Sequence, residues 1–299
     1  MSADNDHPAN AAARAHRTLL PDHNDLGLDS LLTLPPYWGW VEHRPESSLI
    51  PFRMLLGGND DGVALRLFWN GHYEEETLAL WTRLARHHVL ALDIGAHTGV
   101  YTLAARVANP GLNVLSFEPD AGNYARLTLN LRANGHATDD AYMLGISDAD
   151  GTGAFTTRTH SDYRSSGGTF ETVEGGHSSD LRIATLDSFL PPGIATSVGL
   201  IKLDVEGHEP AVFAGMRGLV ERSRPTLVFE CLSNATAVAA GEMLGPLGYH
   251  FFEIDDEART VCETTSLSPV LDADDNPVMS RLNRVASCRA EDLAIIRAA

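Results

Sequence analysis

The sequence predicts an α/β protein in which a mostly parallel sheet is covered by helices on both faces. Three observations support this fold class. From residue 89 onward, short apolar runs alternate with helical patterns of about 10 to 15 residues, as in βαβ units. Glycine or an acid follows several of these runs, as at the ligand-binding ends of parallel strands. The length of 299 residues and the 43% hydrophobic content suit one large domain.

The acidic composition limits the class of partner. The chain has 22 basic and 40 acidic side chains and a formal net charge of −18, which argues against nucleic acid or an anionic membrane. No apolar run approaches the roughly 20 residues of a membrane span, and residues 1–10 lack the apolar core of a signal peptide. Cys231, Cys262 and Cys288 show no CxxC spacing, which disfavours a disulfide framework and a zinc ribbon. We therefore expect a cytoplasmic protein.

Residues 1–48 are expected to form an N-terminal extension that is partly disordered. Residues 1–30 show no sustained period, so one short helix is the most that is expected there. The aromatic turn segment from Leu34 to Trp40 either packs against the main domain or forms a cover that faces the substrate. Residues 49–299 are then the main domain, in which 148–180 and 258–290 are expected to be variable loops.

The first predicted strand and helix carry clear local signals. A helical pattern begins at Tyr73 and leads into an apolar run at 89–94, which is typical of a buried strand. Thr98 is placed to cap the following helix, whose apolar residues recur three, four and seven positions after Val100. Pro110-Gly111 ends that helix.

The alternation continues to the end of the chain. The second strand is expected at 113–117, and Asp120 caps a helix that Gly135 stops. Further strands are expected at 141–146, 198–203, 225–229, 250–254 and 293–296, with helices at 208–221 and 235–247. Because ligands bind at the carboxyl ends of parallel strands, the residues that follow the strands are the place to look for a site.

A glycine turn follows the first strand, in the segment Asp93-Ile-Gly95-Ala-His97-Thr98-Gly99. Glycines allow a tight turn and a close approach of the backbone to a ligand, and the next helix directs free amides toward an anionic group. The spacing is GxxxG and differs from the GxGxxG of dinucleotide folds. This motif alone is compatible with a purely structural turn and with a ligand-binding turn.

Glu118 follows the second strand, where an acid can accept hydrogen bonds from both hydroxyls of a ribose. The alternative is a negative charge that stabilises the start of the next helix. Together with the glycine turn, Glu118 favours a nucleoside-binding site. A negative pocket also suits a cationic ligand.

Polar residues gather after the fourth strand, at Lys202, Asp204, Glu206 and His208. Lys202 and Asp204 are two positions apart, so they share one face of an extended strand. Lys202 is the only lysine of the chain, which indicates a role for a compact ammonium group unless its position is a matter of chance.

Glu230 follows the fifth strand and could face Asp204 across neighbouring strand ends. Two such carboxylates could hold a divalent ion such as Mg²⁺ through oxygen ligands. The alternative is that Glu230 pairs with a cation or caps the next helix.

Five strings, in order and with natural spacing, resemble the FkbM family of S-adenosylmethionine-dependent methyltransferases. They are LDIGAHTGVYTLAA, FEPDAGNYARLTLN, ATLDSF, GLIKLDVEGHEPAVFAGM and PTLVFE. The similarity runs from about Tyr73 to Glu230, and the IKxDVEG string is its most specific part. The resemblance implies a Rossmann-like class I methyltransferase with a seven-stranded sheet, whose last, antiparallel strand is expected at 293–296. It also implies methylation of a hydroxyl, often on a sugar or a polyketide-type natural product.

The resemblance also assigns residues to the donor S-adenosylmethionine. Asp93, Gly95 and the Thr98-Gly99 turn would hold its methionine end, and Glu118 its ribose. The remaining implied contacts involve Asn123 beside Glu118, Ile146 and Ser147 at the adenine, and Tyr73 and Glu74 before the first strand. His97 stands where many members of the family have asparagine, which bears only on a contact made by that side chain.

Methyl transfer to a hydroxyl needs alignment of the acceptor oxygen and a base that takes its proton. His208 is the preferred base by chemistry, because it titrates near neutrality. Asp204 or Glu206 could serve instead, with Lys202 ordering the carboxylates, and a metal between Asp204 and Glu230 could activate the acceptor directly.

Two other functions share part of this pattern. An NAD(P)-dependent oxidoreductase would have the same βαβ start, but no hydride-transfer site is apparent. A catalytically inactive S-adenosylmethionine-binding module would keep the fold without the chemistry. The expected partner is a small hydroxylated molecule, and the sequence leaves open whether the chain forms a homo-oligomer.

Overall fold

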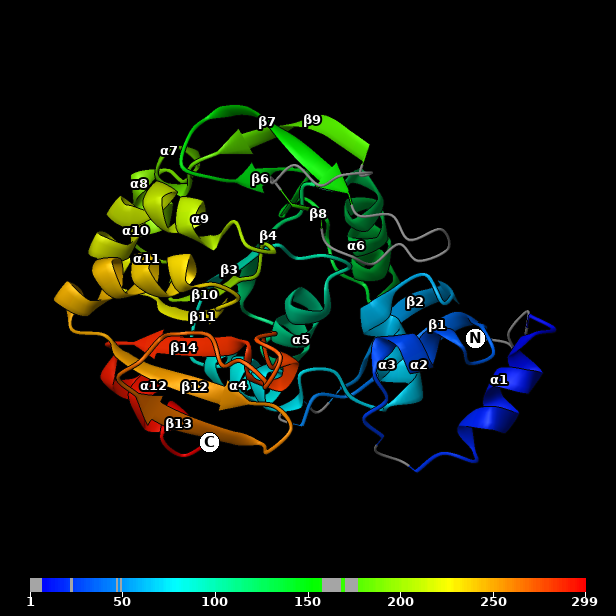
Figure 1. The fold of residues 1–299 in the computed structure, drawn as a ribbon. Helices are drawn as coiled ribbons and strands as arrows, with labels where there is room; N and C mark the ends of the chain where they lie inside the picture. Colours follow the sequence, from blue (N-terminus) through cyan, green and yellow to red (C-terminus); the bar gives the residue numbers. More distant parts are fainter. Residues whose placement is uncertain (1–6, 22–23, 47, 49, 158–167, 170–176) are drawn as a thin grey trace.

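The computed structural model describes residues 7–21, 24–46, 48, 50–157, 168–169 and 177–299 (Figure 1). An eight-stranded sheet with the strand order β13-β12-β14-β11-β10-β3-β4-β5 lies at its centre. Its strands are β3 (Leu90–Ile94), β4 (Asn113–Phe117), β5 (Ala141–Tyr142), β10 (Leu200–Leu203), β11 (Thr226–Glu230), β12 (His250–Asp255), β13 (Thr260–Thr264) and β14 (Asn283–Ser287). The run from β5 through β4, β3 and β10 to β11 is parallel, which confirms the predicted fold class.

Strand β14 lies between β11 and β12 and is antiparallel to both. The predicted strand at 293–296 is wrong, because those residues belong to helix α12 (Ala290–Ile296). Glu291 and Asp292 in the first turn favour this helix, since acidic groups stabilise a helix N-terminus. The edge strand β13 brings the sheet to eight strands, one more than expected.

Helices cover both faces of the sheet, and each face has its own apolar core. On one face α4 (Glu75–Ala85), α5 (Val100–Ala108), α6 (Ala121–Ala133) and α12 contribute buried side chains. On the other lie α7 (Leu186–Phe189), α8 (Pro192–Ala195), α9 (Glu209–Gly215), α10 (Arg217–Ser223) and α11 (Asn234–Leu244). The strands alternate between the cores: Ala91 packs on the first face, and Leu90 and Leu92 on the second.

The N-terminal elements pack against the first face of the sheet and beside α5 and α6 (blue in Figure 1). They are α1 (Asn10–Arg17), α2 (Leu28–Leu32), β1 (Tyr37–His43), β2 (Phe52–Gly58) and α3 (Gly62–Trp69). The aromatic segment expected as a turn is mostly strand, because β1 pairs with β2 along its whole length.

A second sheet has the order β6-β9-β7-β8. Its strands are β6 (Gly145–Ile146), β7 (Gly151–Thr157), β8 (Gly168–Thr169) and β9 (His177–Ala184). Strands β7 and β9 pair in antiparallel fashion, so part of the variable loop expected at 148–180 is regular strand. The predicted strand at 141–146 is divided, because β5 pairs with β4 and β6 pairs with β9.

Two further local predictions need correction. Gly99 takes the N-cap position of α5 with a φ of 102°, and no side chain, Thr98 included, caps that helix. The helix expected at 208–221 is interrupted at Met216. The backbone at the neighbouring Gly215 lies close to the backbone at Ser147, so a Cβ on residue 215 would lie 1.9 Å from the Ser147 carbonyl oxygen. Asp120, in contrast, caps α6 as predicted, and its side chain accepts a hydrogen bond from the Asn123 amide.

In the part of the chain that the structure describes, no helix has both the length and the apolar character needed to span a membrane. Two short 3₁₀ turns, η1 (Gly245–Leu247) and η2 (Met279–Arg281), complete the elements.

Candidate active site

A cavity of about 1140 Å³ opens at the carboxyl ends of β3, β4, β10 and β11. It exceeds the roughly 300–1,000 Å³ of typical small-molecule pockets, so it has room for a donor and an acceptor together. Nine of the residues predicted from the sequence line it: Tyr73, Glu74, Gly95, His97, Glu118, Ile146, Asp204, Glu206 and Glu230. The other predicted residues are not part of the lining; they are Asp93, Thr98, Gly99, Asn123, Ser147, Lys202 and His208.

The cavity wall is strongly acidic. It includes Asp25, Glu74, Glu75, Glu118, Asp204, Glu206, Glu230, Asp256 and Glu257. Only two arginines face these groups in the described part of the wall, and one of them, Arg259, pairs with Glu75. Such a field favours a ligand that carries positive charge, as expected from the sequence.

The turn after β3 brings the backbone into the cavity. Gly95 has a φ of 81°, and a Cβ there would lie 1.6 Å from the Asp204 carbonyl oxygen, so only glycine fits. The amides of Gly95 and Ala96 both donate to the Phe117 carbonyl oxygen at 2.9 Å, which fixes the turn against the end of β4. Gly99 serves packing instead, since a Cβ there would lie 2.6 Å from Leu127 Cδ1.

Glu118 lies at the end of β4 with both carboxylate oxygens held by backbone amides. Its Oε2 accepts from the His97 amide at 2.8 Å and its Oε1 from the Asp120 amide at 2.9 Å. Burial raises the pKa of Glu118 to about 8, against the backbone hydrogen bonds and the Asn123 side-chain hydrogen bond, which lower it. The side chain of Asn123 thus supports Glu118, and its predicted contact with the donor stays a prediction.

We expect Glu118 to make the free protein less stable as the pH rises from about 4.5 to about 8. The Glu118 carboxyl binds its proton more tightly in the folded state than in the unfolded chain. The resulting stabilisation is fully present below pH 4.5 and is lost as the pH rises to about 8. The measurement is urea unfolding at both ends of the window for the wild type and for Glu118→Gln. The stability of the wild type relative to the variant should fall with pH, and parallel profiles would contradict the assignment.

Asp93 is buried in β3, away from the cavity. Its Oδ2 accepts from the Thr102 hydroxyl at 2.6 Å, and burial raises its pKa to about 6 although the hydrogen bond with Thr102 lowers it. Asp93 therefore anchors α5 to the sheet. The structure gives it no direct place on the cavity wall.

The end of β10 carries a buried ion pair. Lys202 is fully buried, and its Nζ donates to Asp204 Oδ2 at 2.9 Å and to Asn283 Oδ1 at 3.3 Å. The same nitrogen lies 4.7 Å from the centre of the Tyr101 ring. Burial alone would lower the pKa of Lys202, but Asp204 and Glu74 together hold it above its usual value. The pair thus fixes one carboxylate at the cavity by means of a cation behind it.

Glu74 links three distant segments at the edge of the cavity. It adopts a left-handed conformation with a φ of 41°, and its Oε2 accepts from the Tyr101 hydroxyl and from Asn283 Nδ2. The sequence did not point to Tyr101 or Asn283. Tyr101 lies in the motif LDIGAHTGVYTLAA, in which only the acid, the histidine, the threonine and the glycines were considered as site residues. Asn283 lies in a strand that was not predicted.

His208 does not face the cavity. Its Nε2 lies 2.9 Å from the Ser147 hydroxyl, and neither residue is part of the cavity wall. This arrangement argues against the choice of His208 as the base and leaves Asp204 and Glu206 as the carboxylates on the wall.

The predicted metal site at Asp204 and Glu230 finds no support. Lys202 already supplies the positive charge beside Asp204. Within the described ranges, no three His, Cys, Asp or Glu side chains are grouped so that they could hold a metal ion.

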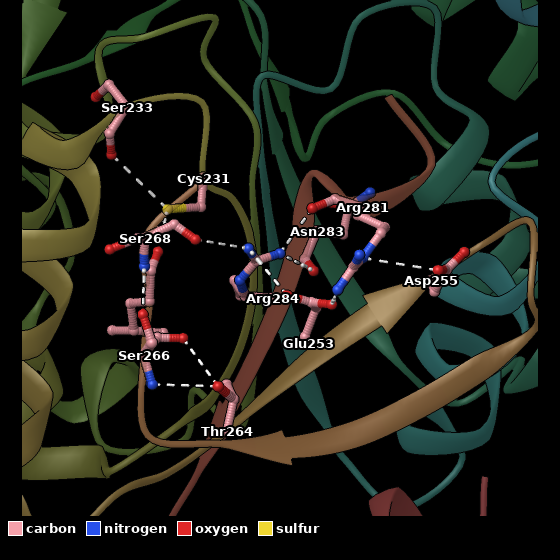
Figure 2. A network of polar contacts seen from close by, with 11 residues as sticks. Cys231, Ser233, Glu253, Asp255, Thr264, Ser266, Ser268, Arg281, Asn283 and Arg284 are labelled. Atoms are coloured by element: carbon pink, nitrogen blue, oxygen red, sulfur yellow. Dashed lines mark hydrogen bonds and ion pairs between the residues drawn. The ribbon is translucent and has the colours of Figure 1, made fainter. Parts of the chain in front are cut away.

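A buried arginine holds the segment that closes the cavity on the side of η2. Arg284 donates to the carbonyl oxygens of Arg281, Asn283 and Ser268, and lies 3.5 Å from Glu253 (Figure 2). Val278, Met279, Ser280 and Leu282 line the cavity from this segment. The network therefore fixes a wall whose sequence carries no recognisable motif.

Comparison with known proteins agrees with the motifs. The sequence model of the family described as "Methyltransferase FkbM domain" matches residues 93–258. The hexuronic acid methyltransferase AglP of Haloferax volcanii is 28% identical over 155 residues, which cover 50% of this chain and 58% of that relative.

Similar solved structures include the FkbM methyltransferase from Methylobacillus flagellatus KT. It is 14% identical with a TM-score of 0.46, over 74% of this chain and 52% of that one. The precorrin-6y C5,15-methyltransferase from Geobacter metallireducens GS-15 is 13% identical with a TM-score of 0.40, over 72% of this chain and 89% of that one.

Proposed function

The chain belongs to the FkbM methyltransferase family, and from this premise we propose that it transfers a methyl group from S-adenosylmethionine to a hydroxyl of a small polyhydroxylated acceptor. The carboxylate of Asp204, fixed by Lys202 at the cavity wall, is the observation that carries the proposal. The acceptor would be a sugar or a natural product such as a glycoside or polyketide. The relative AglP, whose name refers to a hexuronic acid, supports the sugar.

The cavity fits S-adenosylmethionine by its chemistry. The donor carries a sulfonium and an ammonium group, which the acidic wall would attract. The Gly95 turn would hold its methionine end and Glu118 its ribose, and Ile146 with Phe155 and Phe117 would border the adenine. When bound, the donor supplies a reactive methyl group, so alignment of the acceptor accounts for much of the catalysis.

Asp204 would take the proton of the acceptor hydroxyl. A carboxylate within hydrogen-bond reach can accept that proton as the oxygen becomes an ether, and Lys202 keeps the carboxylate in place from behind. The intact pair also argues against an inactive binding module. Asn24, Asp25 and Leu28 line the cavity, which supports a role of the N-terminal extension as a cover over the acceptor.

The test is a screen with S-adenosylmethionine and a panel of hexuronic acids, hexosides and hydroxylated polyketides, each with and without a chelator. Mass spectrometry should detect S-adenosylhomocysteine together with an acceptor that has gained one methyl group. Because no three His, Cys, Asp or Glu side chains of the described residues are grouped so that they could hold a metal ion, we expect activity to be indifferent to the chelator. Absence of any methylated product, with the donor bound, would contradict the proposal.

A further inference from the structure

Glu230 is the last residue of β11 and lines the cavity beside the Asp204 carboxylate. Its Oε2 atom is buried, and within the described chain this atom has no hydrogen-bond partner. Native proteins pair nearly all buried polar atoms with protein, water or ligand, so an unpaired carboxyl oxygen on a cavity wall calls for an explanation. Burial raises the pKa of Glu230 well above its usual value, with Asp204 and Glu206 adding to the effect.

The polar groups around Glu230 are directed elsewhere. Lys202 Nζ donates to Asp204 and Asn283. Asn283 is paired in register with Glu230 across the strands β14 and β11, yet its amide nitrogen donates to Glu74. The polar side chains at the neighbouring strand ends therefore hydrogen-bond to one another. The Oε2 atom of Glu230 is left as an acceptor for a ligand that binds in the cavity.

The placement of Glu230 relates it directly to the proposed base. Leu203 and Phe229 are register partners in the parallel strands β10 and β11, so Asp204 and Glu230 both follow a matched pair at the same edge of the sheet. Neighbouring strands lie about 4.8 Å apart, which is a suitable spacing for two carboxyl groups that contact neighbouring oxygens of one small molecule.

We propose that Glu230 hydrogen-bonds a second hydroxyl of the acceptor, next to the hydroxyl that Asp204 deprotonates. This inference rests on the proposed function and narrows the acceptor to a molecule with adjacent hydroxyls, as in a pyranose ring. A hydroxyl both donates and accepts, so it can satisfy a carboxyl group in either protonation state. Glu230 is then a specificity-determining residue, and the bond that it makes orients the reacting oxygen.

The test compares methyl glucoside, methyl galactoside and methyl mannoside with their 2-, 3- and 4-deoxy counterparts. Binding to the protein loaded with S-adenosylhomocysteine is measured by ligand-observed NMR, and methyl transfer is measured in parallel. At least one glycoside should bind, and one of its deoxy counterparts should bind about 10-fold or more weakly, because a buried acceptor atom is then left unpaired.

Two variants connect this difference to Glu230. Glu230→Leu should bind the glycoside and its deoxy counterpart equally, whereas Glu230→Gln, which can still hydrogen-bond, should keep part of the discrimination. Glu230→Leu should also melt no lower than the wild type, since it removes an unpaired buried group. Glu242→Gln on the exposed side of α11 is the matched control and should behave as the wild type.

The outcomes separate the two proposals. Equal binding of all deoxy compounds, retained discrimination in Glu230→Leu, or no binding of any glycoside would overturn the inference. A lower melting temperature of Glu230→Leu would also overturn the inference, because it would show that Glu230 stabilises the fold. Glu230 could do so through a water molecule that hydrogen-bonds both to it and to another group of the protein. Glycoside binding with the expected discrimination but without methyl transfer to any acceptor would overturn the proposed function and leave the role of Glu230 intact.

Discussion

Replacing Asp204 by asparagine is expected to lower kcat by about 100- to 10,000-fold, the usual contribution of a general base. Asparagine has the same shape and can still accept the hydrogen bond of Lys202, but its amide cannot take a proton from the acceptor. Because the Asp204 side chain lies beside the donor's expected position without supporting the Gly95 turn, affinity for S-adenosylhomocysteine should change little. The rate of S-adenosylhomocysteine formation, with the acceptor found in the screen, measures the effect.

Calorimetric titration with S-adenosylhomocysteine and circular dichroism are the controls for the Asp204→Asn experiment. They separate a loss of chemistry from a loss of donor binding or of fold. A kcat within about tenfold of the wild type would show that another group takes the proton, with Glu206 as the next candidate on the wall.

Replacing Lys202 by methionine is expected to lower the free energy of unfolding by about 2–4 kcal/mol. Methionine fills much of the same volume, so the loss comes from the charge: Asp204 and Asn283 lose a donor, and the cation between several carboxylates disappears. The expected value lies below that of a fully buried pair, because 24% of the Asp204 side chain still reaches solvent. Turnover should fall as well, since the carboxylate is no longer held in position.

Denaturant unfolding at neutral pH measures the stability of Lys202→Met. Arg217→Met is a suitable control, because Arg217 is exposed on α10 and makes no ion pair within the described residues. A change in Lys202→Met no larger than in the control would mean that the ion pair contributes little and that Lys202 is placed there for another reason.

The sequence was a reliable guide where the signal is local. The strand 113–117 and the Asp120 cap are found as predicted, because apolar runs and capping side chains depend on near neighbours. Gly95 and Glu118 come together at the cavity because each directly follows a parallel strand of one sheet. The motif at 202–206 likewise brings Asp204 and Glu206 to the wall.

Strand β14 could not be read in this way. Its sequence, NRVAS, is mostly polar, yet all five residues are buried. Arg284 donates to the Ser268 carbonyl oxygen and lies 3.5 Å from Glu253, and the Ser287 hydroxyl lies 2.7 Å from that of Thr226. These partners are distant in sequence, so no local sequence pattern predicts that β14 is a buried strand. The last strand was therefore predicted at 293–296, where the residues are apolar, although these residues form part of an amphipathic helix.

The orientation of side chains was also beyond the sequence. His208 has suitable chemistry at a suitable position, but only the path of the chain between β10 and α9 turns its ring toward Ser147. The ion pair of Lys202 was anticipated as an ordering contact, whereas its place over the Tyr101 ring and beside Asn283 depends on the packing of three separate segments.

The position of β14 has a consequence for biosynthesis. Asn283 contacts Lys202 and Glu74, which lie 81 and 209 positions before it in the chain. Because domains fold while the ribosome is still adding residues, the first parallel strands can pair long before this strand has been made. A nascent chain halted after β12 would lack the strand between β11 and β12, so the contacts of Asn283 with Lys202 and Glu74 form only after β14 has been made.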